Sequence, residues 1–142
     1  KIAKIKDIPN QLPIQGIFQV RGELYAPYRA ANFSQRIASG FLKAREGSGE
    51  GISFCSFQIL NSRLNQHEAK KHLKKLGFST PKDVYCNFTS QVQIFRKQWL
   101  DKKLFSEYPT DGIVVKINSR KLQFIREKSY GCYPHWQMAI KY

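Results

Sequence analysis

The chain has 142 residues, which is enough for one domain of ordinary size with a hydrophobic core. Lysine and arginine number 24 against 10 aspartates and glutamates, so the formal net charge is +14 and favours an anionic partner such as nucleic acid, a nucleotide or an acidic membrane surface. No apolar run reaches the roughly 18 residues of a membrane span, and no signal-peptide core is present. The three cysteines form no Cys-x-x-Cys pair, so they support neither a disulfide framework nor a zinc ribbon and fit a reducing, cytoplasmic compartment.

The first part of the chain predicts two strands separated by a helix. Residues 16–25 alternate apolar and polar side chains and stop before Pro27, which is typical of a strand. Residues 32–43 place apolar side chains at helical spacing and predict a helix that ends near the glycines that follow. Residues 51–60 predict the second strand.

Residues 65–76 carry the clearest helix signal in the chain. Asn65 is a suitable N-cap, Glu68 follows three residues later and Gly77 supplies the stop. The expected buried side is Ala69, Leu73 and Leu76. The expected solvated basic face is Lys70, Lys71, Lys74 and Lys75.

The rest of the chain predicts further strands and one helix. A short strand is expected at 84–88, a helix at 90–103, and strands at 111–118 and 136–142. The helix would turn one apolar side to the core, formed by Val92, Phe95 and Trp99. Helices and strands are mixed and nothing repeats, so the pattern indicates the α+β class, with antiparallel sheets and packed helices.

Two of these strands end in a lysine, Lys116 and Lys141, 25 positions apart. Side chains of a strand alternate between its faces, so Lys116 shares a face with Val114 while the opposite face packs into the core. Apolar surface beside an ammonium group suits an anionic ligand with a flat apolar part, which describes a nucleotide. The alternative is a pair of ordinary strands that end in solvated lysines.

Three other patterns point to no chemistry. His67 and His72 resemble a zinc-protease motif, but they are five positions apart rather than four, so they do not share a helix face. The glycines at 47, 49 and 51 do not link a strand to a helix as a phosphate loop does, and predict a surface loop. The basic run at 70–75 suits either solvent or a phosphate backbone.

Four segments, taken in order, resemble one known family over nearly the whole chain. They are Gln19-Val-Arg-Gly-Glu-Leu-Tyr25, the strand around Phe57, Tyr108-Pro-Thr-Asp-Gly-Ile-Val-Val-Lys-Ile-Asn118 and Pro134-His-Trp-Gln-Met-Ala-Ile-Lys-Tyr142. The adenylation domain of NAD-dependent DNA ligases has Arg-Gly-Glu, Asp-Gly-Val-Val-Val-Lys-x-Asn and Pro-Arg-Trp-Ala-x-Ala-x-Lys strands in the same order. The resemblance implies an ATP-grasp-like nucleotidyltransferase fold, with residues 1–142 as the C-terminal portion of that domain and no second domain.

The resemblance also implies how the chain holds its nucleotide. Glu23 matches the glutamate that contacts the ribose, Phe57 falls where an aromatic ring stacks on adenine, and Val114 falls on the other face of the purine. Lys43 and Lys103 stand where the family has arginines.

Asp111, Lys116 and Lys141 match the carboxylate and the two lysines that work around the nucleotide phosphate. Attack on the α-phosphorus builds negative charge on its oxygens, and positioned ammonium groups in a partly dry cleft stabilise that charge.

The chain also departs from the family pattern. The nucleophilic lysine of the family lies in a Lys-x-Asp-Gly motif, which is absent from these 142 residues. Gln35 and His135 stand where the family has arginines. We therefore expect the chain alone to form no lysyl-adenylate and to be one part of an active site.

The resemblance implies an enzyme that uses NAD and Mg²⁺ to seal nicks in duplex DNA together with the remaining ligase domains, and no membrane partner. Two alternatives stay open. One is an ATP-dependent ligase or RNA-capping relative with the same core fold. The other is a ligase-like protein that has lost catalysis and binds DNA through its charge.

Overall fold

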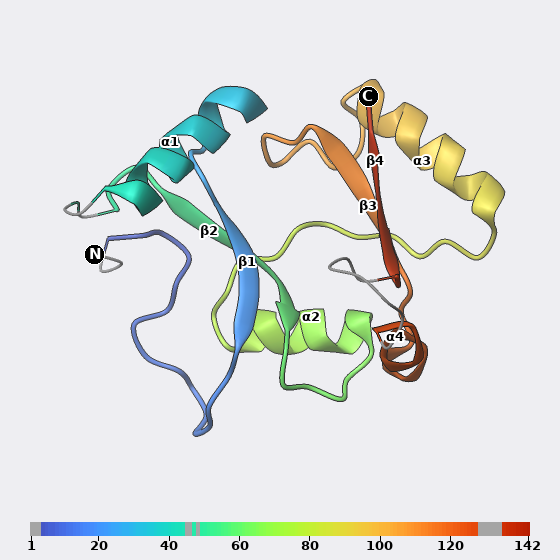
Figure 1. Cartoon of the computed structure of the whole chain (residues 1–142), viewed down its shortest axis with the longest axis horizontal. Coiled ribbons are helices and arrows are strands. Elements are labelled where there is room, and N and C mark those ends of the chain that lie inside the picture. Colours follow the sequence, from blue (N-terminus) through green and yellow to red (C-terminus); the bar gives the residue numbers. More distant parts are fainter. Residues whose placement is uncertain (1–3, 45–46, 48, 128–134) are drawn as a thin grey trace.

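The computed structural model describes residues 4–44, 47, 49–127 and 135–142 and has the expected α+β character (Figure 1). Its elements, in chain order, are β1 (Val20–Tyr25), α1 (Ala31–Lys43), β2 (Ser53–Ile59), α2 (Gln66–Lys75), α3 (Thr89–Leu100), β3 (Gly112–Lys116), α4 (Arg120–Glu127) and β4 (Gln137–Lys141). Cys132 and Pro134 lie outside the described residues. No helix in the described part is long and apolar enough to cross a membrane.

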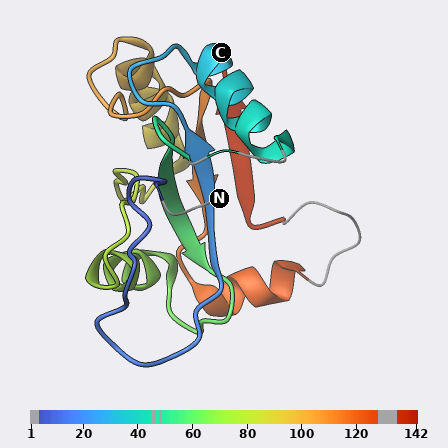
Figure 2. The same ribbon diagram turned by 90° about the vertical axis from the view of Figure 1, so that its left-hand side faces the viewer.

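The strands form two separate antiparallel pairs. β1 pairs with β2, and β3 pairs with β4, with no ladder between the pairs in the described part of the chain. Figures 1 and 2 show α2 and α4 at one end of these pairs, and α1 and α3 at the other. The separation matters because residues of the first pair meet residues of the second only through side chains and connecting segments.

The two registers fix which side chains are neighbours. In the first pair Arg21 lies opposite Gln58 and Gly22 opposite Ser56, so Phe57 is an extra residue with no partner across the ladder. Such a bulge re-aims the side chain of the extra residue.

In the second pair Gly112 lies opposite Lys141 and Lys116 opposite Gln137. The two strand-ending lysines therefore occupy opposite ends of the same pair.

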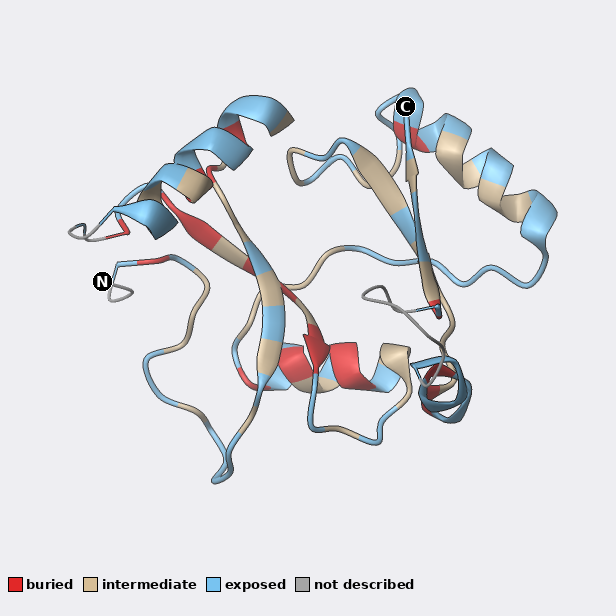
Figure 3. Ribbon diagram, in the orientation of Figure 1, coloured by how far each residue is buried: buried red, intermediate tan, exposed pale blue. Residues whose placement is uncertain are grey.

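The core lies between β2 and α2, where Figure 3 shows the buried residues gathered. Leu73 of α2 and Leu76, which caps the end of this helix, are 0% and 1% exposed, and Ser56 of β2 is 0% exposed. The predicted buried side of this helix is confirmed, and Ala69 completes it at 6%. The predicted side of α3 is also correct, with Trp99 buried and Val92 and Phe95 half-buried.

The basic face predicted on α2 is wrong at Lys70. Its side chain is 8% exposed, and its Nζ lies 2.9 Å from an Asp83 carboxylate oxygen. The reason is a nearby counter-charge, which makes burial of the ammonium tolerable. Lys71, Lys74 and Lys75 are exposed as expected.

The strand predicted at 84–88 does not form. The segment instead continues from Asp83, which binds α2, and the ring of Tyr85 lies 5.2 Å from the ring of His67. Its apolar side chains face outward, since Phe88 is 71% exposed, and it pairs with no described strand. β-branched and aromatic composition alone therefore gave a false strand.

The sequence prediction also missed α4 and overextended several elements. The Ser119 Oγ accepts a hydrogen bond from the Leu122 N–H at 3.3 Å, so an N-cap signal was present for this short helix. The first strand begins at Val20 rather than at residue 16, and α3 ends at Leu100, two residues before Lys102 adopts a left-handed φ of 57°.

We expect Leu73→Ala to lower the free energy of unfolding by about 2–5 kcal/mol, because it leaves a cavity in the core between β2 and α2. Leu122→Ala removes the same atoms from a side chain that is 49% exposed and should cost less than about 1 kcal/mol. Urea unfolding of both variants tests the comparison. Equal losses would place the core elsewhere.

Candidate functional site

Lys116 lies where the two strand pairs meet. It is the last residue of β3, and its Nζ is 4.8 Å from the centroid of the Phe57 ring of β2. The same Nζ is 5.9 Å from the centroid of the Trp136 ring, just before β4. An ammonium held over aromatic faces gains a cation–π attraction that compensates part of its lost hydration. The structure thus brings together two of the predicted site residues, Lys116 and Phe57.

The surroundings of Lys116 disfavour its charged form. Burial, and then the positive charges of Arg21 and Lys70, lower the pKa of Lys116 to about 8. The ammonium therefore lies in an electropositive, partly dry environment, and a bound anion would favour it. This is the electrostatic condition for binding a phosphate group.

Trp136 adds an unused hydrogen-bond donor. It is 3% exposed, and its indole Nε1 has no hydrogen-bond partner within the described ranges. A hollow of about 220 Å³ lies here, lined by the adjoining ends of β3 and β4, with Lys116, His135 and Trp136 among its residues. A buried donor without a partner is costly, so its presence beside a lysine favours an acceptor ligand.

Cys55 lies near these groups but is not a candidate nucleophile. It faces Glu23 across the β1–β2 ladder. Burial raises the pKa of the Cys55 thiol to about 11, so the thiol stays protonated near neutral pH. The neighbouring Tyr108 hydroxyl lies 2.9 Å from the Ser79 hydroxyl, and burial raises the pKa of Tyr108 to about 12.

Asp111 and Lys141 form a second centre at the other end of the β3–β4 pair. The Lys141 Nζ donates to the Asp111 carboxylate at 2.8 Å, and both side chains are about two-thirds exposed. This hydrogen bond lowers the pKa of Asp111 and raises the pKa of Lys141. Exposed ion pairs contribute little stability, so both groups are available to a ligand at small cost.

Lys116 and Lys141 do not lie side by side. Gly112 is opposite Lys141 in the register, so the backbones of the two lysines are separated by the length of β3, about 14 Å at 3.4 Å per residue. Their backbones alone do not define one phosphate pocket. Any shared ligand must lie between them.

The remaining predicted residues occupy the periphery. Glu23 is exposed on β1, and Val114 is 54% exposed on the same face of β3 as Lys116. Lys43 is exposed in the last turn of α1, and Lys103 follows α3, 4.0 Å from Asp101. Figure 1 shows α1 and α3 on opposite sides of the strand pairs.

Sequence reasoning did not single out Arg21, Lys70, Trp136 or Asn118 as functional residues. Arg21, Trp136 and Asn118 lie inside matched motifs, so the motif letters were a usable signal. Lys70 was placed only in a basic run that suits solvent or a phosphate backbone, and its burial beside Asp83 gave no sequence signal. Within the described ranges no group of three or more metal-binding side chains is present.

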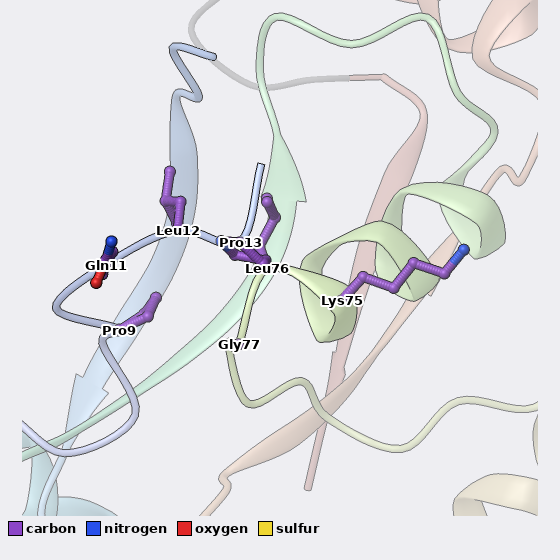
Figure 4. Close-up of a pocket in the computed structure, with 7 residues that line it drawn as sticks. All are labelled: Pro9, Gln11, Leu12, Pro13, Lys75, Leu76 and Gly77. Atoms are coloured by element: carbon purple, nitrogen blue, oxygen red, sulfur yellow. The ribbon is translucent and has the colours of Figure 1, made fainter. Parts of the chain in front are cut away.

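A second hollow, of about 440 Å³, lies away from this site, between the N-terminal segment and the end of α2 (Figure 4). Pro9, Leu12 and Pro13 line one side of it, and Lys75 and Leu76 the other. It contains none of the predicted site residues.

Comparison with known proteins agrees with the motifs. The model of the NAD-dependent DNA ligase adenylation domain matches residues 50–142, and the chain belongs to this family. Over 99% of its length the chain is 29% identical to a DNA ligase of Pseudothermotoga lettingae, and over 98% it is 28% identical to a DNA ligase of Wigglesworthia glossinidia brevipalpis. It covers 24% and 28% of those proteins, so it spans about a quarter of the length of the curated relatives that it matches.

We expect the burial of Lys116 to make stability depend on pH. Its folded pKa of about 8 lies below the value of about 10.4 for an unfolded lysine, so between these values the unfolded chain binds more protons. The contribution of Lys116 to stability therefore rises with pH across this window. Below pH 8 the folded state carries the full cost of the buried ammonium.

Lys116→Met removes that cost and should be more stable than the wild type by about 2 kcal/mol at pH 7, with a smaller advantage at pH 10. Urea unfolding at both pH values measures the two gaps. Lys71→Met, at an exposed position of α2, is the control and should show the same small gap at both. An unchanged gap for Lys116→Met would show that this ammonium is not buried.

Proposed function

We propose that this chain is the C-terminal portion of the adenylation domain of an NAD-dependent DNA ligase. The observation that carries the proposal is Lys116, which matches a family lysine and is held against Phe57, beside the Trp136 indole N–H that has no partner among the described residues. A cation, an aromatic ring and a buried donor in one place suit a nucleotide phosphate and its base. The family match supports NAD as the source of the adenylate.

The proposed reaction has three steps. A lysine supplied from outside these 142 residues attacks the α-phosphorus of NAD, which forms lysyl-AMP and releases nicotinamide mononucleotide. The AMP then passes to the 5′-phosphate at a nick in duplex DNA. Finally the 3′-hydroxyl attacks that phosphorus, which forms the phosphodiester bond and releases AMP.

In this scheme Lys116 and Lys141 stabilise the charge that develops on phosphate oxygens, and neither is the attacking group. Lys116 acts from a partly dry position, where a charge interaction is stronger than in water. Asp111 forms an ion pair with Lys141, and a phosphate would compete with Asp111 for the ammonium.

Phe57 and Val114 would bind the adenine and Glu23 the ribose, following the family pattern. Lys43 and Lys103 would contact the nucleotide from the periphery, with single-point charges in place of the bidentate contacts of arginine.

Mg²⁺ belongs to the proposed chemistry, in which it would neutralise phosphate oxygens. Magnesium is bound through one or two carboxylates together with substrate phosphates. Of the two carboxylates in the predicted set, Asp111 is paired with Lys141 and Glu23 matches the ribose contact. We therefore assign no magnesium ligand in this chain.

A second candidate is a DNA-binding protein without ligase activity, favoured by the charge of +14. Such a protein would bind duplex DNA with an affinity that falls steeply with salt and would transfer no AMP. Incubating the full-length protein with labelled NAD or labelled ATP separates the possibilities. Label retained from NAD supports the proposal, label from ATP alone indicates the ATP-dependent relative, and label from neither indicates the binding protein.

We expect Lys116→Ala and Lys141→Ala in the full-length protein each to slow self-adenylation by about 100-fold, as removal of one oxyanion-stabilising group does. Lys71→Ala, a lysine exposed on α2, should leave the rate unchanged. Gel detection of AMP-labelled protein over time gives the rates. Wild-type rates in both site variants would overturn the roles assigned to these lysines.

A further inference from the structure

Asn118 joins the end of β3 to the start of α2. It follows Lys116 by two residues, and its side-chain Oδ1 accepts a hydrogen bond from the backbone N–H of His67 at 2.9 Å. Its backbone carbonyl accepts one from the N–H of Gln66, also at 2.9 Å. Gln66 and His67 are the first two residues of α2, whose N–H groups have no partner within the helix.

The arrangement is reciprocal. Asn65, which precedes α2, turns its side-chain Oδ1 to the backbone N–H of Arg120 at 3.0 Å. Arg120 is the first residue of α4. Each asparagine therefore caps the helix that follows the other, and the two chain segments are tied together at both helix starts. Asn65 also forms the predicted capping box of its own helix with Glu68.

The same turn of α2 also holds Phe57. The Gln66 side-chain amide donates to the Phe57 carbonyl at 2.9 Å. Gln66 thus binds Phe57 through its side chain and Asn118 through its backbone N–H. This short path connects Phe57 to Asn118, and the segment between Lys116 and Asn118 is fixed further because the Gln123 side chain donates to the Ile117 carbonyl at 2.6 Å.

This connection carries weight because the two strand pairs share no ladder in the described part of the chain. Lys116 belongs to one pair and Phe57 to the other, so sheet hydrogen bonds cannot set the distance between them. The start of α2 binds both segments and can therefore set this distance.

We propose that Asn118 is a positioning residue for Lys116, and that its side-chain oxygen, by capping α2, holds the end of β3 where the Lys116 ammonium meets the Phe57 ring. The inference rests on the proposed function, in which Lys116 acts on phosphate. Asn118 itself touches no reacting atom in this scheme.

The test uses the full-length protein and compares variants at two asparagines. Asn118→Ala removes the accepting oxygen, whereas Asn118→Asp keeps an oxygen in the same place and is a favoured partner for a helix N-terminus. Asn61→Ala is the matched control, because Asn61 also makes two hydrogen bonds to backbone groups, with Gln19 and Ile17, beyond the end of β2.

We expect Asn118→Ala to slow self-adenylation by about 100-fold, since a misplacement of about 1 Å at a reacting centre has an effect of that size. Asn118→Asp and Asn61→Ala should stay within about five-fold of the wild type, about 1 kcal/mol in activation free energy. A wild-type rate for Asn118→Ala, an equal loss for Asn61→Ala, or an equal loss for Asn118→Asp would overturn the proposal. If Asn118→Ala does not fold, Asn118→Gln, which displaces the same oxygen by one methylene group, takes its place with the same expectation.

A second measurement does not depend on activity. Lys116 is labelled with an amine-acylating reagent across a pH series, and its modification is followed by peptide mass spectrometry. Arg21, Lys70 and Cys55 are the titratable groups around Lys116, and all remain in every variant. The labelling midpoint should lie near pH 8 in the wild type and in Asn61→Ala, and should rise by about one unit or more in Asn118→Ala as the ammonium regains water.

An unchanged midpoint in Asn118→Ala would overturn the positioning role even if the rate fell. Failure of the proposed function looks different: the wild type then transfers no AMP from NAD, while the midpoints still report whether Asn118 positions Lys116.

Discussion

The pair of reciprocal caps between Asn65 and Asn118 is the constraint on which the rest of the site depends. The described strands form two separate two-stranded pairs, and such a pair is only marginally stable alone. The start of α2 has N–H groups without partners inside the helix, and it obtains them from the segment after Lys116. Satisfying a local backbone requirement therefore also sets the tertiary position of a lysine.

The charged side chains that act on Lys116, Arg21 and Lys70, are positive. Lys70 has its own counter-ion in Asp83, whereas Lys116 has two aromatic rings and positive neighbours. Burying such an ammonium costs free energy that folding alone does not recover. In the proposed function an entering anion would compensate this cost, so the feature that weakens the fold would favour ligand binding. The overall charge of +14 attracts polyanions, whereas the positive surroundings of Lys116 would bind one phosphate in a defined place.

The sequence was informative where one local pattern decides the structure. The buried side of α2 follows from spacing alone, and the strands around Lys116 and Lys141 follow from apolar runs. It was uninformative where a distant group decides. The burial of Lys70 needs Asp83, and the additional bond of Asn65 to the Arg120 N–H involves a residue 55 positions away. Periodicity also could not reveal that antiparallel pairing places the two lysines at opposite ends of one strand pair, because register depends on both strands together.

The contact between Lys116 and Phe57 also constrains how a base could bind. Lys116 covers one face of the ring, and Val114 lies on the same face of β3 as the lysine. In the proposed function, a purine that stacks on the face of Phe57 covered by Lys116 would take the place of the ammonium. The displaced ammonium would lose its cation–π contact, and a phosphate attached to the same ligand would offer a stronger interaction. Base stacking and phosphate binding would then be coupled through a single side chain, which would favour a complete nucleotide over either fragment alone.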